Sequence, residues 1–166
     1  AGDQCDDGNL ANNDGCSSVC KIEAVNEAES NNTCATANGP YALTKPNVPV
    51  LINASITPAN EQDWFKFTVT NFADLRFETF DASGPGSCAT IDTELQVFKA
   101  DCVTTQTIVQ DQGGLGNCSR LDPSGFTTLQ RLPAGTYNLK VFPFSTSATF
   151  AYTVQATVVA LCGNNV

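Results

Sequence analysis

The chain has 166 residues, about the length of one domain, with 17 acidic and 8 basic residues and a formal net charge of −9. This balance argues against nucleic-acid binding, which needs a basic surface over the phosphates. Histidine is absent, which excludes Ser-His-Asp and Cys-His nucleophiles and imidazole-based zinc sites, and no apolar run approaches the ~18–20 residues of a membrane span. Eight cysteines without zinc-ribbon spacing indicate disulfides, hence a secreted or cell-surface protein.

The first segment in chain order is an acidic, cysteine-rich head. Residues 1–34 hold four of the eight cysteines and seven of the 17 acids, but only one basic residue. Because large apolar residues are scarce there, this segment needs disulfides, a metal ion or both to fold. Calcium takes about 6–8 oxygen ligands from carboxylates, amides and carbonyls, whereas the alternative is a solvated series of Asx turns. The oxygen-bearing side chains that predict a calcium loop here are Asp6, Asp7, Asn9, Asn13 and Asp14.

From Tyr41 onward, short β-type runs alternate with turn residues, and no long amphipathic helix pattern occurs. This spacing predicts an all-β fold, an antiparallel, jelly-roll-like β-sandwich preceded by the small disulfide-rich calcium-loop segment. The phenylalanines and Trp64 are interpreted as its core, with an aromatic platform for stacking sugars as the alternative. The expected strands are residues 48–56, 64–69, 75–80, 94–98, 107–109, 127–132, 136–142 and 149–159.

The cysteines of the sandwich bracket the expected strand at 94–98 and two loops. Cys88, Cys102 and Cys118 predict at least one disulfide there, and because three is an odd number, one of them pairs elsewhere, with Cys34 the nearest candidate. Spacing does not fix the connectivity. All eight cysteines are disulfide candidates: Cys5, Cys16, Cys20, Cys34, Cys88, Cys102, Cys118 and Cys162.

Residues 3–23, which include CDDGNLANNDGCSSVC, resemble the cysteine-rich Asp-Asp-Gly-Asn repeat of myxobacterial and related bacterial surface proteins, similar in style to Notch-type calcium repeats. Members of that family commonly open with Cys-Gly-Asn-Gly. That opening does not precede the motif here, but the segment LCGNNV at 161–166 looks like it. The resemblance implies a unit that repeats end to end, either within a covalent tandem array or through Cys162 completing the head of its own or a neighbouring copy.

Residues 27–158 resemble a bacterial pre-peptidase C-terminal (PPC) domain, the β-sandwich appended to many secreted proteases, to which the collagen-binding domains of clostridial collagenases are related. The stretches that carry the resemblance are EAESNN at 27–32, QDWFKF at 62–67, DTELQVF at 92–98 and LPAGTY at 132–137. The usual entrance has proline where this chain has Ser30. In the collagen-binding relatives, calcium lies between this entrance and the acid before the aromatic strand.

Carried over residue by residue, the PPC resemblance implies a calcium site in this chain. The implied ligands are Glu27, Glu29, Asn31 and Asn32, with Asp63 and Glu61. The alternative is that Glu27 and Glu29 are solvated linker charges and that Asp63 caps a turn. A third oxygen-rich patch, Asp92 with residues 111–114, is expected to be a loop rather than a cation site.

We therefore divide the chain into a head (1–25), a PPC-like sandwich (26–160) and a tail that resembles the next repeat (161–166). The PPC resemblance implies a module that does no catalysis, and the acids are not paired as in a glycosidase, so we expect no enzyme. The predicted function is a calcium-binding extracellular structural or adhesive module, one unit of a repeating surface protein or self-assembling fibre. Its expected partners are copies of itself.

The alternative function is a ligand-binding module that targets a secreted hydrolase to collagen-like extracellular matrix or to a polysaccharide. Exposed tyrosines would favour it. The chain has only Tyr41, Tyr137 and Tyr152, and the last two lie in expected core strands.

Overall fold

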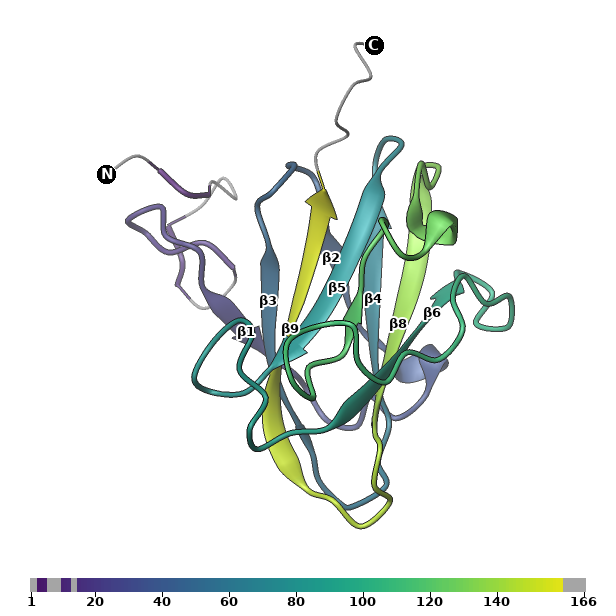
Figure 1. Ribbon diagram of the computed structural model, residues 1–166. Helices are drawn as coiled ribbons and strands as arrows, with labels where there is room; N and C mark the ends of the chain where they lie inside the picture. Colours follow the sequence, from purple (N-terminus) through teal and green to yellow (C-terminus); the bar gives the residue numbers. More distant parts are fainter. Residues whose placement is uncertain (1–2, 6–9, 13–14, 160–166) are drawn as a thin grey trace.

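The computed structural model describes residues 3–5, 10–12 and 15–159, and two β-sheets facing each other make up its body (Figure 1). The first sheet has five strands in the order β1-β3-β9-β5-β7: β1 (Ala24–Asn26), β3 (Val50–Ile56), β9 (Phe150–Val159), β5 (Asp74–Phe80) and β7 (Arg120–Leu121). The second has four in the order β2-β4-β8-β6: β2 (Asn38–Ala42), β4 (Asp63–Val69), β8 (Gly135–Pro143) and β6 (Thr93–Lys99). The predicted all-β sandwich is confirmed.

The core forms because alternate residues of the long strands are apolar and point between the sheets. Phe65 and Phe67 of β4 are fully buried, as are Phe77 of β5 and Leu139 of β8. The rings of Phe67 and Phe77 meet across the two layers with their centroids 5.2 Å apart. Aromatic pairs at this spacing add to the stabilisation from burial, so the middle strands hold the two sheets together.

The long central strands pair antiparallel, as predicted, but the outer pairs β1–β3 and β2–β4 run parallel. The fully antiparallel expectation is therefore wrong at this edge of the sandwich. Both parallel partners are short, and neither β1 nor β2 was expected as a strand. In β2, Gly39 and Pro40 interrupt any alternation, and the register shifts at that point.

Two expected strands are absent from the described residues. The run at 107–109 lies in a loop beside β6, where the Thr107 hydroxyl accepts a hydrogen bond from the Val97 backbone N–H (3.0 Å) in place of a regular ladder. The run at 127–132 instead begins with the short 3-10 helix η2 (Thr127–Leu129). A second 3-10 helix, η1 (Cys34–Thr36), precedes β2. No helix within the described ranges is long and apolar enough to cross a membrane.

Three disulfides join cysteines of the described residues: Cys5–Cys16, Cys34–Cys102 and Cys88–Cys118. Among those residues Cys20 forms no disulfide, and Cys162 lies outside them. The Cys88–Cys118 bridge is buried in the core, whereas Cys34 and Cys102 are partly exposed. The odd cysteine of the sandwich is thus Cys102, and its partner Cys34 lies between β1 and β2.

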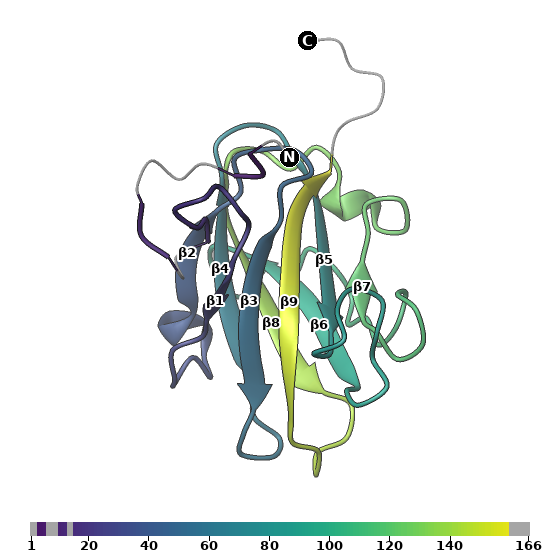
Figure 2. The same cartoon turned by 90° about the vertical axis from the view of Figure 1, so that its left-hand side faces the viewer.

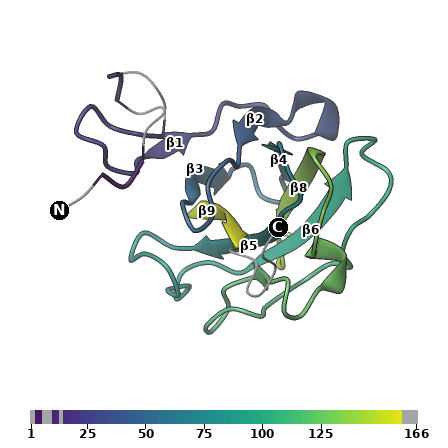
Figure 3. The same cartoon turned by 90° about the horizontal axis from the view of Figure 1, so that it is seen from above.

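The segment between β1 and β2 determines where charged groups gather. It leaves the edge of the five-stranded sheet after Asn26 and reaches the edge of the four-stranded sheet at Asn38, so residues 27–37 cross from one layer to the other (Figures 2 and 3). We call residues 27–37 the crossing loop. It contains the acidic entrance found in the sequence.

Candidate metal centre

Three carboxylates meet where the crossing loop passes the start of β4. One oxygen from each of Glu27, Glu29 and Asp63 lies within 4.8 Å of the others. Glu27 is placed by β3, because its backbone N–H donates to the Asn53 carbonyl (2.9 Å) and so extends the β1–β3 pairing by one residue. Asp63 is the first residue of β4. The start of β4 therefore supplies one carboxylate, and the crossing loop supplies two, of which Glu27 lies at the point where the loop leaves the first sheet.

Glu27 is half-buried and accepts several hydrogen bonds. Its Oε1 accepts from the backbone N–H (2.5 Å) and the hydroxyl (3.3 Å) of Ser55, and its Oε2 accepts from the amide of Asn31 (3.4 Å). Burial nonetheless raises the pKa of Glu27 to about 7, and the neighbouring Glu29 carboxylate raises it further against the effect of these hydrogen bonds. The carboxyl of Glu27 therefore takes up a proton more readily than an exposed glutamate does.

Asp63 is completely buried. Its Oδ2 accepts a hydrogen bond from the Tyr152 hydroxyl (2.5 Å), whereas its Oδ1 has no partner. Burial raises the pKa of Asp63 to about 8, and the charges of Glu27, Glu61 and Glu29 raise it further, although the bond from Tyr152 lowers it. Burial and the Asp63 carboxylate in turn hold the pKa of Tyr152 well above its usual value.

Asn31 adds an amide to the same place. It is completely buried, its carbonyl accepts from the Trp64 backbone N–H (3.0 Å), and its Oδ1 has no hydrogen-bond partner. A buried polar atom left unpaired costs about 1–3 kcal/mol, so orphaned oxygens are rare in folded proteins. Here the orphaned Oδ1 atoms of Asn31 and Asp63 both belong to side chains of one acidic cluster. Carboxylate and amide oxygens are the ligands that calcium prefers.

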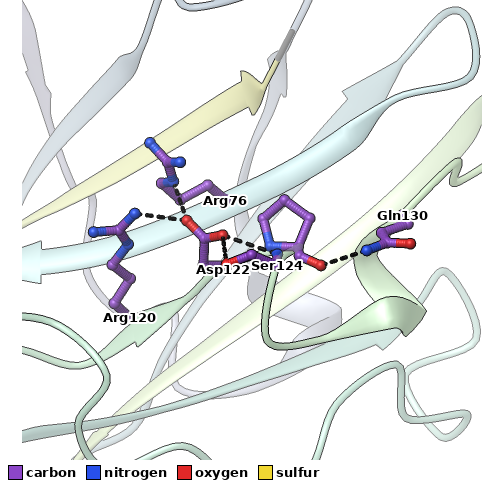
Figure 4. Close-up of polar contacts among 6 residues, drawn as sticks. Arg76, Arg120, Asp122, Ser124 and Gln130 are labelled. Atoms are coloured by element: carbon purple, nitrogen blue, oxygen red, sulfur yellow. Dashed lines mark hydrogen bonds and ion pairs between the residues drawn. The ribbon is translucent and has the colours of Figure 1, made fainter. Parts of the chain in front are cut away.

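No basic side chain forms an ion pair with this cluster among the described residues. The two ion pairs found there both belong to Asp122, whose Oδ2 lies 2.6 Å from Arg76 Nε and 2.6 Å from Arg120 Nη2 (Figure 4). Ser124 donates to Asp122 Oδ1 from its backbone N–H (2.9 Å) and its hydroxyl (2.6 Å). Burial alone would raise the pKa of Asp122, but the bonds from Ser124, Arg120 and Arg76 hold it well below its usual range.

The structure therefore brings together Glu27, Glu29 and Asp63 from the implied ligand set, with Asn31 in contact with Glu27. Glu61 is buried, but its Oε2 accepts from the Thr57 backbone N–H (2.8 Å) and closes the turn between β3 and β4. Asn32 is exposed beside the cluster. The ligands predicted for the head lie outside the described residues: Asp6, Asp7, Asn9, Asn13 and Asp14.

Sequence reasoning missed the two hydrogen-bond donors that hold the carboxylates, Ser55 and Tyr152. Both lie inside strands, and Tyr152 is 89 residues from Asp63 along the chain. Nothing in the local sequence distinguishes Tyr152 from a core residue such as Tyr137, which is also buried. Only the pairing of β3 with β9 brings Tyr152 near the entrance, since it lies opposite Ala54.

The third oxygen-rich patch, around Asp92 and Asp111, is a less favourable candidate for a cation site. Burial raises the pKa of Asp92 and of Glu94, and the charge of Asp111 adds to both. Of the described acids, however, only Glu27, Glu29 and Asp63 form a group of three with ligand atoms this close together. The loop interpretation of Asp92 stays a prediction.

No protein-family model matches the sequence, and no curated protein matches it. Among solved structures, the chain is similar to the pre-peptidase C-terminal domain of a collagenase from Bacillus anthracis, at 13% identity and a TM-score of 0.48 over 72% of this chain and 98% of that one. It is also similar to PliG, a periplasmic inhibitor of g-type lysozyme from Aeromonas hydrophila, at 12% identity and a TM-score of 0.37 over 70% and 95% of the two chains. At these levels neither likeness assigns a family or an activity.

Proposed function

We propose that this chain is a non-catalytic, calcium-binding module of an extracellular protein, and that Glu27, Glu29, Asp63 and Asn31 hold the ion. One observation carries the proposal: three carboxylates meet with no basic partner among the described residues, where Asp63 is buried, Glu27 is half-buried and Glu29 is exposed, and two buried side chains there, Asp63 and Asn31, each leave an oxygen without a partner. Burying like charges together is costly unless a cation or protons offset them. A bound divalent cation removes that cost and gives both orphaned oxygens a partner.

The donor set favours calcium over other metals. All the side-chain donors are oxygens, and zinc prefers nitrogen and sulfur ligands. Magnesium requires near-ideal octahedral geometry and usually keeps several waters, whereas calcium accepts irregular cages drawn from a loop and a strand. A site built from the crossing loop and β4 is of the irregular kind.

The position of the site favours a structural role for the ion. Glu27 extends the pairing of β1 with β3 in one sheet, and Asp63 begins β4 in the other. An ion shared by the two would fasten the entrance of the sandwich to its body. Because the cysteine-rich head (1–25) joins the sandwich at β1, the same ion would stiffen the connection between head and sandwich.

The wider proposal follows from the sequence. We propose that the head, the PPC-like sandwich (26–160) and the tail (161–166) form one unit of a repeating or self-assembling surface protein. The three disulfides support an oxidising compartment outside the cytoplasm. Assembly through Cys162 would give a ladder on a non-reducing gel that collapses on reduction, and a single monomeric band in both lanes would contradict it.

A second candidate is a targeting module, and the outer face of the four-stranded sheet supports it. Trp64, interpreted from the sequence as a core residue, is indeed buried (8% exposed), but it alternates with Phe65 on β4 and packs against Phe98 on the outer side of this sheet, with ring centroids 5.0 Å apart. Lys140 lies over the rings of Trp64 (5.9 Å) and Phe142 (4.5 Å). Trp64 is covered, but Phe142 is partly exposed, and an exposed aromatic ring can stack on a sugar ring. Co-sedimentation with insoluble polysaccharide, lost in Phe142→Ala, would favour this function.

The experiment for the main proposal is a calcium titration of the melting temperature. We expect the melting temperature of the wild-type chain to rise with calcium and to rise less in Glu29→Gln. Glu78→Gln, on β5 away from the site, is the matched control and should respond like the wild type. A wild-type melting temperature that calcium leaves unchanged would contradict the proposal.

A further inference from the structure

The crossing loop is closed at its neck by one side chain. Asn38 at the start of β2 accepts from the backbone N–H of Ala28 (2.7 Å) and donates to the carbonyl of Ala28 (2.9 Å). Both ends of the loop are thus fixed to strands. The residues between them include two of the proposed ligands, Glu29 and Asn31.

Two tethers hold the middle of the loop to the sandwich among the described residues. One is the hydrogen bond from the Trp64 backbone to the Asn31 carbonyl (3.0 Å), and the other is the Cys34–Cys102 disulfide. Cys34 opens η1, in which Thr33 and Thr36 hydrogen-bond each other (2.9 Å between the hydroxyls), and η1 packs against β4. Because Asn31 and Cys34 are three residues apart, fixing η1 restricts where Asn31 lies.

The other end of the disulfide is firmly anchored. The turn after β6 is closed by the Lys99 backbone N–H donating to the Thr104 carbonyl (2.8 Å), and the Asp101 carboxylate accepts from the Thr104 hydroxyl (2.5 Å) and the Val103 backbone (3.0 Å). The buried amide of Asn138 on β8 donates to the Lys99 carbonyl (3.0 Å). The disulfide therefore connects the loop to a rigid part of the four-stranded sheet.

We infer that the Cys34–Cys102 disulfide positions the crossing loop for the cation, so that calcium affinity depends on this bond. The inference rests on the proposed calcium site. A loop held near its bound conformation loses less conformational entropy when the ion binds, and this preorganisation raises affinity. Without the disulfide, Glu29 and Asn31 lose one of the two tethers that hold them near Asp63 and must be ordered by the ion itself.

The Cys88–Cys118 disulfide provides the matched control. It is buried, and Cys88 Sγ lies 3.4 Å from the Thr79 carbonyl of β5, on the side of the five-stranded sheet away from β1. Removing it should lower the stability of the sandwich without loosening the crossing loop. Comparing calcium affinity after loss of each disulfide therefore distinguishes an effect of loop position on ion binding from a general loss of stability.

The test compares calcium dissociation constants by isothermal titration calorimetry for the wild type, Cys34→Ser/Cys102→Ser and Cys88→Ser/Cys118→Ser, below the melting temperature of each. We expect Cys34→Ser/Cys102→Ser to weaken calcium binding about tenfold or more. We expect Cys88→Ser/Cys118→Ser to change the dissociation constant less than about twofold. Terbium, an oxygen-seeking calcium substitute, gives a second readout, because its luminescence would be sensitised by Tyr152 beside Asp63.

The outcomes distinguish the two claims. If the wild type binds calcium and loss of Cys34–Cys102 leaves the dissociation constant unchanged, or both disulfide variants weaken it equally, the inference is overturned and the calcium site stands. If the wild type binds no calcium, both fail. If the Cys34→Ser/Cys102→Ser variant does not fold, the partly exposed Cys34–Cys102 bond can instead be reduced with a phosphine and alkylated in the folded wild type. Mass spectrometry verifies which cysteines are modified, and the modified protein is used in the same titration.

Discussion

Asp122 and Asp63 are both carboxylates on the sandwich, but the charges around them have opposite signs. Two guanidinium groups and Ser124 surround Asp122, and its pKa lies well below the usual range. Other carboxylates surround Asp63, and its pKa is raised to about 8. The first cluster balances its charge with residues of the same chain. The second balances it only when protons or a cation come from outside, which is the signature expected of a binding site rather than of a structural ion pair.

The two carboxylates therefore respond to pH in opposite directions. Asp122 has a folded pKa below its unfolded value, so its stabilising contribution is present above about pH 4 and is lost as the pH falls further. Asp63 and Glu27 have folded pKa values above their unfolded ones, so their contribution is present below about pH 4 and is lost as the pH rises through about 7 to 8. In the proposed site, calcium would bind the ionised forms and offset that loss.

The largest expected effect comes from Asp63→Asn. This substitution removes the buried charge and a central residue of the proposed site, so calcium should no longer raise the melting temperature, while the ion-free protein should be more stable than the wild type at pH 8. Calorimetry with and without calcium measures both. A variant that still gains stability from calcium like the wild type would show that Asp63 is not a ligand.

The next effect is the pH dependence of calcium binding. Because Glu27 and Asp63 have pKa values of about 7 and about 8, calcium must displace protons below those values. Affinity should rise about tenfold per pH unit for each proton displaced between pH 6 and 8, and flatten above about pH 9. Dissociation constants measured across this range test the prediction, and an affinity that falls with rising pH would contradict it.

Asp122→Asn should produce a smaller effect that calcium does not change. The substitution removes a charged acceptor from two arginines and should destabilise the fold by about 1–3 kcal/mol, as expected for hydrogen bonds to charged groups. Chemical denaturation measures the loss. The free energy of unfolding should fall by the same amount with and without calcium. If calcium restored the stability of this variant, the Asp122 cluster would not differ from the Asp63 cluster in the way described.

The smallest effect expected is that of Tyr152→Phe. It removes the single hydrogen bond to Asp63 Oδ2 and should raise the pKa of Asp63 further, which weakens calcium binding a few-fold at pH 7 and less at pH 9. Tyr137→Phe is the control, because that hydroxyl donates to the Pro133 carbonyl (2.9 Å) elsewhere in the sandwich. Equal effects of the two substitutions on calcium affinity would argue against a role for Tyr152 at the site.

The sequence predicts the strands whose alternation matches a half-buried sheet. Residues 64–69 and 75–80 correspond to β4 and β5 because each presents an apolar face to the other sheet. The runs at 107–109 and 127–132 carry β-branched residues, but in or directly beside them only isolated bridges form, Gln110 with Leu95 of β6 and Leu132 with Ala73, so tertiary contacts override propensity there. Strands β1 and β7 are too short, at 3 and 2 residues, to show any period.

The candidate site was predictable only in part for a similar reason. Glu27, Glu29 and Asn31 are close in sequence and belong to a recognisable stretch, and the resemblance adds Asp63. The donors Ser55 and Tyr152, and the Arg76–Asp122–Arg120 cluster, depend on strand register and on which strands are neighbours, which local sequence does not encode.

The most direct test of the cation site is calorimetric calcium titration of the chain at pH 7 in two buffers that differ in ionisation enthalpy. We predict saturable binding whose observed heat differs between the buffers, because calcium displaces protons from Glu27 and Asp63 as it binds. No binding, or binding that releases no proton, would contradict the account of this cluster as a partly buried acidic site that requires a cation.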